Sequence, residues 1–268
     1  MLKSYFGIEK NPFSIDNVTL LDYQQDIYDI LRVHSQQGGF CLLMGDPGTG
    51  KSVIKEAIKQ QADKNMVVVS VSRTLHTYQN TIKILCQAFN IDFQGDSFKC
   101  EKRLIEEAIN LNRKGKMLVI IIDDAHLMDI ETLRKLRLMF EDFPKNHNVI
   151  LVAQEEIMHV LNLRVNEDIR SRLTYSTTTK KLTNDDIKQF IMNQLDLVQL
   201  GHNIFSEEAI NLIARSADGI LRKVRNLALS CMLEAVRSQQ KNVDLAMVNA
   251  VLIQPHWRVQ HDIQTKTI

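Results

Sequence analysis

The amino-acid sequence predicts an α/β fold: a three-layer domain built around a parallel sheet, followed by a small all-helical domain. Three observations lead to this prediction. Short apolar segments alternate with segments of helical periodicity up to about residue 182. A glycine-rich loop joins the first apolar segment to the first helical one, and beyond residue 182 only helical periodicity remains. The 268 residues are enough for each domain to bury a core of its own.

Four short apolar segments are predicted to be buried parallel strands. They are rich in branched residues and apolar almost throughout, which is typical of strands that helices cover on both faces. A last strand is predicted within residues 173–182. The four apolar segments are residues 39–45, 66–72, 117–122 and 148–154.

Helices are predicted between these strands, because apolar residues recur there at spacings of three and four. Alternating strands and helices imply a parallel sheet with helices on both faces. The helical stretches are residues 53–62, 82–89, 104–111 and 133–143.

The predicted domain boundary lies near residue 183. Residues 1–182 form the first domain, residues 183–254 the helical domain, and residues 255–268 a tail without clear periodicity. Within the helical domain, Ser206 is a good N-cap residue, and Gly219 is suited to the position after a helix end.

The composition favours a cytoplasmic protein without a membrane partner. The longest apolar run has six residues, too few to cross a bilayer, and the first residues lack the apolar core of a signal peptide. The four cysteines are scattered without metal-binding spacing, so we expect reduced thiols. Lys and Arg total 33 against 32 Asp and Glu, so any contact with nucleic acid has to come from a local basic patch.

The segment "GDPGTGKS" (45–52) matches the phosphate-binding pattern GxxxxGK(S/T) and lies between a predicted strand and a predicted helix. Its glycines let backbone N–H groups turn toward phosphate oxygens. Lys51 is expected to reach the β- and γ-phosphates of ATP, and the Ser52 hydroxyl to bind Mg²⁺. The expected nucleotide contacts here are Gly45, Asp46, Pro47, Gly48, Thr49, Gly50, Lys51, Ser52 and Val53.

Asp123 and Asp124 end the apolar segment "MLVIII", about 70 residues beyond Lys51. Asp123 is expected to hold Mg²⁺ through water as a Walker B carboxylate. Asp124 occupies the position where many such ATPases place a glutamate that polarises the attacking water. An aspartate reaches roughly 1.5 Å less, which is one C–C bond. A displacement near 1 Å can cost on the order of a hundredfold in rate, so we predict slow ATP hydrolysis.

Several segments together resemble the AAA+ ATPases, specifically the ExeA-like group. The resemblance covers roughly residues 1–250 and implies a P-loop AAA+ domain followed by a helical lid. The chain departs from the group's pattern at Asp124 for glutamate, His126 for glutamine and Leu221 for proline. The matching segments are "YFGIEKNPF" (5–13), "GDPGTGKS", "IDDAH" (122–126), "LRLMFED" (136–142), "LVAQEEI" (151–157), "IRSRL" (169–173) and "SADGILRKVRN" (216–226).

The resemblance implies roles on both sides of the nucleotide. Asn11, Pro12 and Phe13, within an N-terminal segment 1–38, would lie against the adenine; the alternative for Phe13 is a core aromatic residue. Gln154 matches the sensor 1 residue near the γ-phosphate; the alternative is a glutamine in a turn at the end of a strand.

The resemblance also assigns three arginines. Arg172, or else Arg170, matches the arginine finger that one subunit presents to the ATP of its neighbour, where it would neutralise charge in the transition state. Arg222 matches sensor 2, which the helical lid carries. For each arginine the alternative is an exposed or salt-bridged surface residue.

The expected biological output is regulation of DNA transposition. Stand-alone ATPases of the MuB, TniB and TnsC type polymerise on target DNA with ATP and recruit a transposase or target-selection protein, and hydrolysis disassembles the ring or filament. The alternative is an ExeA-type secretion-assembly or other protein-remodelling ATPase without a nucleic-acid role. The ExeA architecture adds a transmembrane helix and a cell-wall-binding domain, which this sequence lacks, so we expect the first output. A replication initiator or clamp-loader relative is the third possibility.

The resemblance to related filament-forming ATPases implies contacts with duplex DNA on basic residues between the second and third strands. Lys99, Lys102 and Arg103 are the candidates, and the alternative is an ordinary solvated helix face. Contacts to phosphates would make the binding sequence-tolerant and sensitive to salt.

Overall fold

The computed structural model describes residues 2–16, 18–71, 77–92 and 96–257. The chain forms two compact units. One is the α/β unit Leu20–Lys180; the other, the helical unit, combines the chain up to Thr19 with the chain from Lys181 onward. Ser72, the last residue of one predicted strand, and most of the predicted tail lie outside the described residues.

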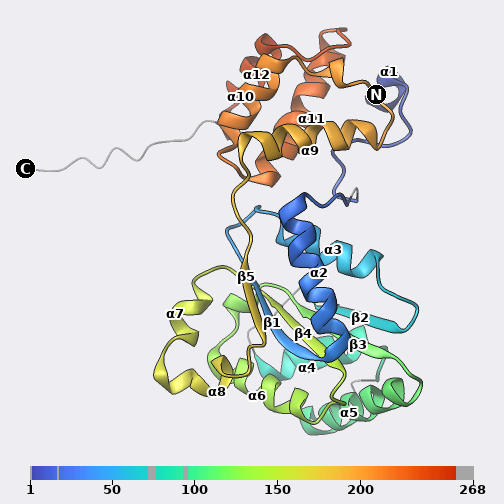
Figure 1. Cartoon of the computed structure of the whole chain (residues 1–268), viewed down its shortest axis with the longest axis vertical. Helices are drawn as coiled ribbons and strands as arrows, with labels where there is room; N and C mark the ends of the chain where they lie inside the picture. The colour runs from blue at the N-terminus through green and yellow to red at the C-terminus, as the bar shows by residue number, and fades with distance from the viewer. Residues whose placement is uncertain (1, 17, 72–76, 93–95, 258–268) are drawn as a thin grey trace, which may run out of the picture. The chain divides into compact units, whose positions relative to one another are not determined.

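The α/β unit contains a sheet of five parallel strands, as the sequence predicts, and their order in the sheet is β2-β3-β4-β1-β5 (Figure 1). Each strand pairs with its neighbours over consecutive residues; for example, Leu42 lies opposite Leu151. Because all strands run the same way, the loops at their carboxyl ends gather at one edge of the sheet. The strands are β1 (Gly39–Met44), β2 (Met66–Val71), β3 (Met117–Ile122), β4 (His147–Val152) and β5 (Tyr175–Thr178).

Helices cover both faces of this sheet, which confirms the three-layer prediction. Leu42, Ile120 and Leu151 belong to one buried cluster with apolar residues of α4, α5 and α6. Side chains alternate along a strand, so the intervening residues face the opposite layer, where α2 packs on β1, β3 and β4 and on α3. The helices of the unit are α2 (Asp22–Gln37), α3 (Lys51–Gln60), α4 (Tyr78–Ala88), α5 (Ser97–Arg113), α6 (Ile130–Glu141), α7 (Ile157–Leu161) and α8 (Glu167–Arg170), with short 3₁₀ turns η1 (Ala125–Leu127) and η2 (Arg164–Asn166).

Helix α2 is the main element that the sequence analysis did not predict. Its buried face includes Ile27 and Leu31 at the spacing of one helical turn. Gln24 and Ser35 occupy the same buried face, so polar residues interrupt the apolar period that would have indicated the helix. Hydrogen bonds satisfy both side chains: the Gln24 amide oxygen accepts from Leu21 N, and the Ser35 hydroxyl donates to Leu31 O.

The helical unit confirms the predicted all-helical segment. Thr183 caps α9 with a reciprocal bond to Asp186, and Ser206 caps α10 through the backbone N–H of Ala209. The chain after α10 turns through left-handed residues, Gly219 among them. The helices are α1 (Leu2–Phe6), α9 (Asn184–Asp196), α10 (Glu207–Ala217), α11 (Leu221–Arg237) and α12 (Leu245–Leu252), with 3₁₀ turns η3 (His202–Ile204) and η4 (Pro255–Trp257).

The N-terminal residues group with the helical unit, whereas the sequence analysis placed them in the nucleotide-binding domain. Phe13 is only 2% exposed, and its ring lies 6.4 Å from that of Phe190 and 6.1 Å from that of Phe205. The Gln194 amide also donates to the Thr19 hydroxyl. The N-terminal segment therefore groups with the helical unit because the ring of Phe13 packs among apolar residues of that unit.

All four cysteines are buried, and none of them forms a disulfide. Burial raises the pKa of the Cys41 thiol to about 11, so it stays protonated at neutral pH. No helix within the described part of the chain has the length and apolarity needed to cross a membrane.

Candidate nucleotide-binding site

The glycine-rich loop connects β1 to α3, as its motif requires. Gly45, Gly48 and Gly50 have φ angles of 147°, 87° and 110°, a region that side chains disfavour. At Gly45 a Cβ atom would lie 2.0 Å from the Thr179 hydroxyl oxygen. The motif's first glycine is therefore required both by backbone conformation and by packing.

Hydrogen bonds beneath the loop hold it against β1 and the end of β5. Thr49 is 1% exposed, and its hydroxyl lies 2.8 Å from Asp46 O and 2.7 Å from the Thr179 hydroxyl. Thr179 also bonds Met44 O, and the Tyr23 hydroxyl bonds Thr49 O. The side chain of Thr49 thus supports the loop, and only its backbone can contact a phosphate. Tyr23 and Thr179 were not predicted, because their roles arise only when distant segments come together.

Lys51 lies across the mouth of the loop. Its Nζ donates to Gly45 O at 2.5 Å and to Asp46 O at 2.9 Å. The same residue opens α3, whose N-terminus adds backbone N–H groups and a partial positive charge. Glycine backbone, helix N-terminus and ammonium group converge here, which is a suitable environment for the phosphates of a nucleotide.

Asp123 lies directly after β3 and forms an ion pair with Lys55 of α3. The two charged atoms are 2.5 Å apart, and the side chains are 18% and 11% exposed. Ser52 precedes Lys55 by three residues on the same helix, so both face the end of β3. A carboxylate and a hydroxyl there fit Mg²⁺, which prefers oxygen ligands. Lys55 already pairs with one oxygen of Asp123, so a Mg²⁺ contact through water remains a prediction for this carboxylate.

Lys55 is a site residue that the sequence analysis missed. On α3 it is spaced like any lysine of an amphipathic helix, and nothing distinguishes it in the sequence from Lys59, which pairs with Glu56 at the surface. Only the position of β3 beside the first turns of α3 reveals its partner.

Asp124 has a left-handed backbone, with φ 54° and ψ 34°. Its N–H donates to the carboxylate of Asp123 at 3.0 Å. A left-handed conformation in a residue other than glycine is unfavourable and tends to occur at functional sites. The turn separates the two carboxylates, so that Asp123 lies beside α3 while Asp124 is exposed.

Gln154 lies at the same edge of the sheet as the loop and the two aspartates. It follows β4, which is placed between β1 and β3, and the preceding Ala153 N–H donates to Leu43 O at 2.9 Å. The Gln154 amide nitrogen is 2.9 Å from His126 Nε2. The fold therefore brings the predicted sensor 1 residue between the phosphate loop and the Walker B segment.

Arg172 lies at the opposite edge of the sheet. It lines a surface hollow with Gly39 and Phe40, at the amino end of β1, and its guanidinium is 3.1 Å from Glu141. Strand β1 has six residues and rises about 3.3 Å per residue, so it spans roughly 20 Å between the hollow at its amino end and Gly45 at its carboxyl end. An arginine side chain extends only roughly 7 Å, about five bonds. Arg172 therefore cannot reach the phosphate loop of its own subunit.

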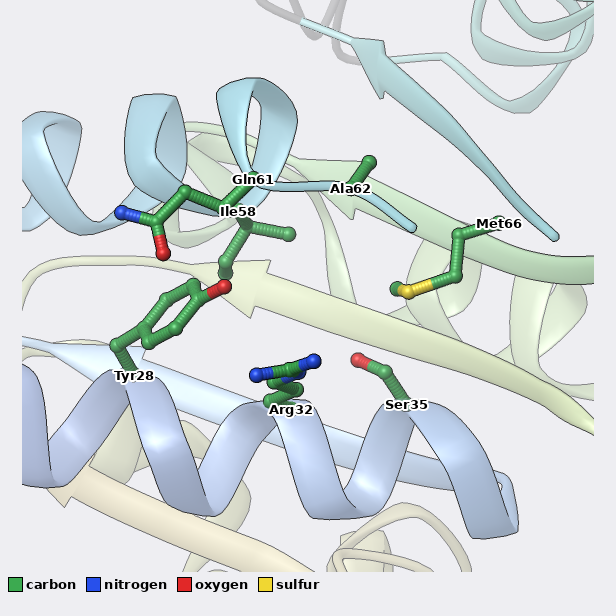
Figure 2. A pocket seen from close by; sticks show the side chains of 7 residues that line it. All are labelled: Tyr28, Arg32, Ser35, Ile58, Gln61, Ala62 and Met66. Atoms are coloured by element: carbon green, nitrogen blue, oxygen red, sulfur yellow. The ribbon is translucent and has the colours of Figure 1, made fainter. Parts of the chain in front are cut away.

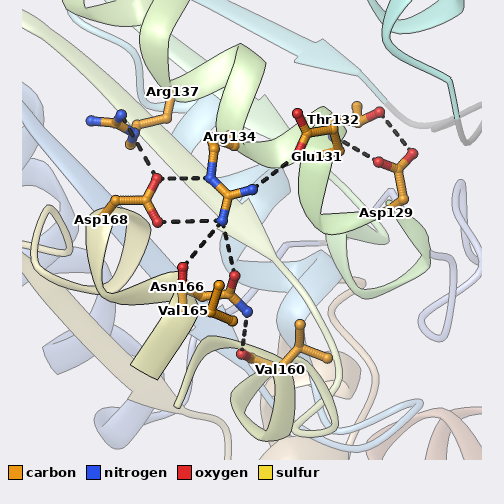
Figure 3. Close-up of polar contacts among 9 residues, drawn as sticks. All are labelled: Asp129, Glu131, Thr132, Arg134, Arg137, Val160, Val165, Asn166 and Asp168. Atoms are coloured by element: carbon orange, nitrogen blue, oxygen red, sulfur yellow. Dashed lines mark hydrogen bonds and ion pairs between the residues drawn. The ribbon is translucent and has the colours of Figure 1, made fainter. Parts of the chain in front are cut away.

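A polar network fixes the segment before Arg172 (Figure 3). Arg134 of α6 donates to Asp168 at 2.9 Å and to the Asn166 side chain at 3.0 Å. The Arg134 guanidinium also lowers the pKa of the Asp168 carboxyl. Arg170, the second candidate for the finger, pairs with Glu167 of its own helix. The network attaches α8 to α6 and leaves Arg172 at the exposed end of the segment.

The remaining predicted nucleotide contacts belong to the helical unit. These are Asn11, Pro12, Phe13 and Arg222, and their roles at the nucleotide remain predictions. Asn11 bonds the backbone N–H of Phe13, and Arg222 lines a surface hollow on α11.

The three predicted DNA contacts are exposed on α5. Lys99, Lys102 and Arg103 lie three and four residues apart and so share one stripe of the helix. Arg103 is engaged with Asp92, whose carbonyl oxygen accepts its hydrogen bond at 2.7 Å. This stripe is opposite the buried face of the helix, where Cys100 packs.

A separate cavity lies between α2, α3 and the start of β2 (Figure 2). Its volume is about 10 Å³, and Tyr28, Arg32 and Met66 are among the residues that line it. A space of that size holds about one water molecule, so it cannot accept a nucleotide.

Comparisons with known proteins agree with this geometry. Residues 33–161 match the family model of the AAA domain. The chain is 25% identical over 234 residues to general secretion pathway protein A of Aeromonas hydrophila. The aligned region covers 84% of this chain and 43% of that protein. This similarity agrees with the predicted resemblance to the ExeA-like group. The chain spans about half the length of the curated relatives that it matches.

Solved structures share the P-loop AAA+ fold. The ORC2 protein of Aeropyrum pernix, in ADPNP and ADP complexes, matches with a TM-score of 0.72 and 14% identity over 93% of this chain and 74% of that one. The ORC1 protein of Aeropyrum pernix in complex with DNA matches with a TM-score of 0.67 and 14% identity over 88% and 65%. At these identities the similarity establishes the fold alone.

Proposed function

We propose that this chain, whose residues 33–161 match the family model of the AAA domain, is an ATP hydrolase that acts as a switch within a ring or filament of its own copies. One observation carries the proposal: the phosphate loop and Asp123 lie at one edge of the sheet, and Arg172 lies at the other. Subunits stacked head to tail would bring Arg172 of one copy to the ATP of the next. Assembly and hydrolysis would then depend on each other.

Hydrolysis by this site should be slow, because Asp124 holds its carboxylate one bond short of the glutamate position. We expect Asp124→Glu to raise kcat by about tenfold to a hundredfold. ATP affinity should change little, since Asp124 does not contribute to the phosphate loop. Steady-state phosphate release, measured at saturating ATP and Mg²⁺, tests this. A variant no faster than the parent would remove the argument for a slow switch.

We infer further that the switch acts on duplex DNA in transposition. In the ATP state, copies would assemble on target DNA and recruit a transposase or target-selection protein, and hydrolysis would release the DNA. The exposed stripe of Lys99, Lys102 and Arg103 supports this inference. A related fold has also been solved in complex with DNA, in the ORC1 protein of Aeropyrum pernix.

Duplex retention tests this output. We expect a slowly hydrolysed ATP analogue to make the protein retain duplex DNA at low salt, regardless of sequence, and Lys51→Ala to abolish retention. The double variant Lys99→Glu/Lys102→Glu should bind at least about tenfold more weakly, and the slope of log affinity against log salt should fall by about two. Arg113→Glu, at the other end of α5, is the matched control and should stay within about twofold of the parent. Nucleotide binding without any DNA retention would reject the DNA output.

The second candidate is an ATPase that assembles or remodels proteins without contacting nucleic acid. The identity to general secretion pathway protein A favours it specifically. The same retention assay separates the two candidates, because a protein-assembly ATPase would respond to ATP by oligomerising without DNA.

A further inference from the structure

The contact between His126 and Gln154 restricts where the imidazole proton can be. The two atoms that meet, His126 Nε2 and the Gln154 amide nitrogen, are 2.9 Å apart. An amide nitrogen donates but does not accept, so His126 Nε2 has to be the acceptor. A neutral ring with an unprotonated Nε2 carries its proton on Nδ1. With the Gln154 amide in this orientation, His126 carries its proton on Nδ1.

In the part of the chain that the structure describes, the other ring nitrogen of His126, Nδ1, has no contact that would favour one tautomer over the other. His126 Nδ1 is buried, and within the described residues it has no hydrogen-bond partner. In one tautomer it is an unsatisfied donor, and in the other it is an unsatisfied acceptor. The Gln154 amide is therefore the contact that decides which tautomer is present.

We propose that His126 is a positioning residue that sets which end of the Gln154 amide faces the nucleotide, and that its tautomer reports the γ-phosphate. This inference rests on the proposed function, in which Gln154 faces that phosphate. In the observed state an amide N–H is committed to His126. A phosphate accepts hydrogen bonds, so it favours an amide turned to present its nitrogen to the nucleotide.

Turning the amide reverses the contact with His126. The Gln154 oxygen then faces the ring, and an oxygen accepts, so His126 has to donate from Nε2. The Nδ1 proton is released to solvent, and a solvent proton is taken up at Nε2, so the ring stays neutral. The two arrangements exclude each other, which makes the pair a two-state element between the Walker B segment and the end of β4.

The tautomer can be read by long-range ¹H–¹⁵N spectra of protein labelled at histidine. We expect the Nδ1–H form of His126 without nucleotide and with ADP, and the Nε2–H form with a non-hydrolysable ATP analogue. The His126→Asn variant identifies the signal among the eight histidines. The Gln154→Glu variant offers only acceptors to the ring, so it should hold a protonated Nε2 even without nucleotide.

Two results would overturn the inference: an Nε2–H ring in the nucleotide-free parent, or no change when calorimetry shows that the analogue binds. If no nucleotide binds, the proposed function fails. The nucleotide-free spectra of the parent and of Gln154→Glu still show whether His126 Nε2 accepts a hydrogen bond from the Gln154 amide nitrogen.

Kinetics add an independent readout of positioning. We expect His126→Ala to lower kcat about tenfold with KM nearly unchanged, as is usual for residues that orient a functional group. His126→Gln keeps a side chain that can bond the Gln154 amide and should recover to within about threefold of the parent. Equal losses in both variants would contradict the role assigned to this contact.

Discussion

Replacing Arg172 with alanine is expected to lower kcat for ATP hydrolysis by about a thousandfold or more, while ATP affinity remains nearly unchanged. The guanidinium would act only on charge that develops in the transition state at the neighbour's phosphate. It lies at the amino end of β1 and pairs with Glu141, far from the phosphate loop of its own subunit. Phosphate release and calorimetric titration of ATP, measured on the same preparation, check both parts.

Arg170→Ala is the matched control for this prediction. Arg170 lies two residues away and has a local partner, Glu167 of the same helix, so its loss should change kcat by no more than about threefold. If Arg170→Ala gave the large loss and Arg172→Ala the small one, the finger would be Arg170. Two small losses would exclude an arginine finger in this segment.

Replacing Lys51 with alanine is expected to weaken ATP binding about a hundredfold. The ammonium group lies across the loop, with Gly45 O and Asp46 O as its partners, and we expect it to exchange these for phosphate oxygens. A hydrogen bond to a charged group contributes about 1.5–3 kcal/mol, and a hundredfold loss corresponds to about 2.7 kcal/mol, which is one such bond net of the two carbonyl contacts that Lys51 gives up. Isothermal titration with ATP and Mg²⁺ measures the change.

Lys59→Ala provides the control on the same helix. Lys59 pairs with Glu56 at the surface of α3, so its removal should leave ATP affinity within about twofold of the parent. Equal weakening by both variants would mean that the net charge of α3, and not the position of Lys51, holds the nucleotide.

The sequence was sufficient to predict the sheet and the phosphate loop because both depend on local patterns. Apolar runs of branched residues define β1 to β4, and the conformations of Gly45, Gly48 and Gly50 follow from the motif itself. Caps such as Ser206 are equally local, since one side chain satisfies the first backbone N–H groups of its own helix.

Residues whose roles depend on distant partners could not be predicted. Lys55 becomes part of the site only because β3 ends beside α3, and Thr179 only because β5 ends beneath the phosphate loop. For Lys55 and Thr179, the deciding interaction joins positions far apart in the sequence. Helix α2 was missed for a different reason, because the polar residues Gln24 and Ser35 are buried with hydrogen bonds satisfied inside their own segment.

The N-terminal segment shows the limit of carrying roles over from a resemblance. The motif "NPF" matches the ExeA-like pattern, but Phe13 is buried between Phe190 and Phe205. Its apolar ring satisfies a packing requirement whether or not a nucleotide is bound. A position beside the adenine remains a prediction for Asn11 and Pro12.

Mixing two inactive variants tests the shared site most directly. At an ATP concentration too low to occupy the weakened site of Lys51→Ala, that variant still presents Arg172, whereas Arg172→Ala binds ATP but lacks the finger. In an equal mixture, one interface in four would combine an intact loop with an intact finger, so hydrolysis should return to about a quarter of the parent rate. A mixture that stays as inactive as its components, under conditions where the subunits co-assemble, would contradict a site built from two copies of the chain.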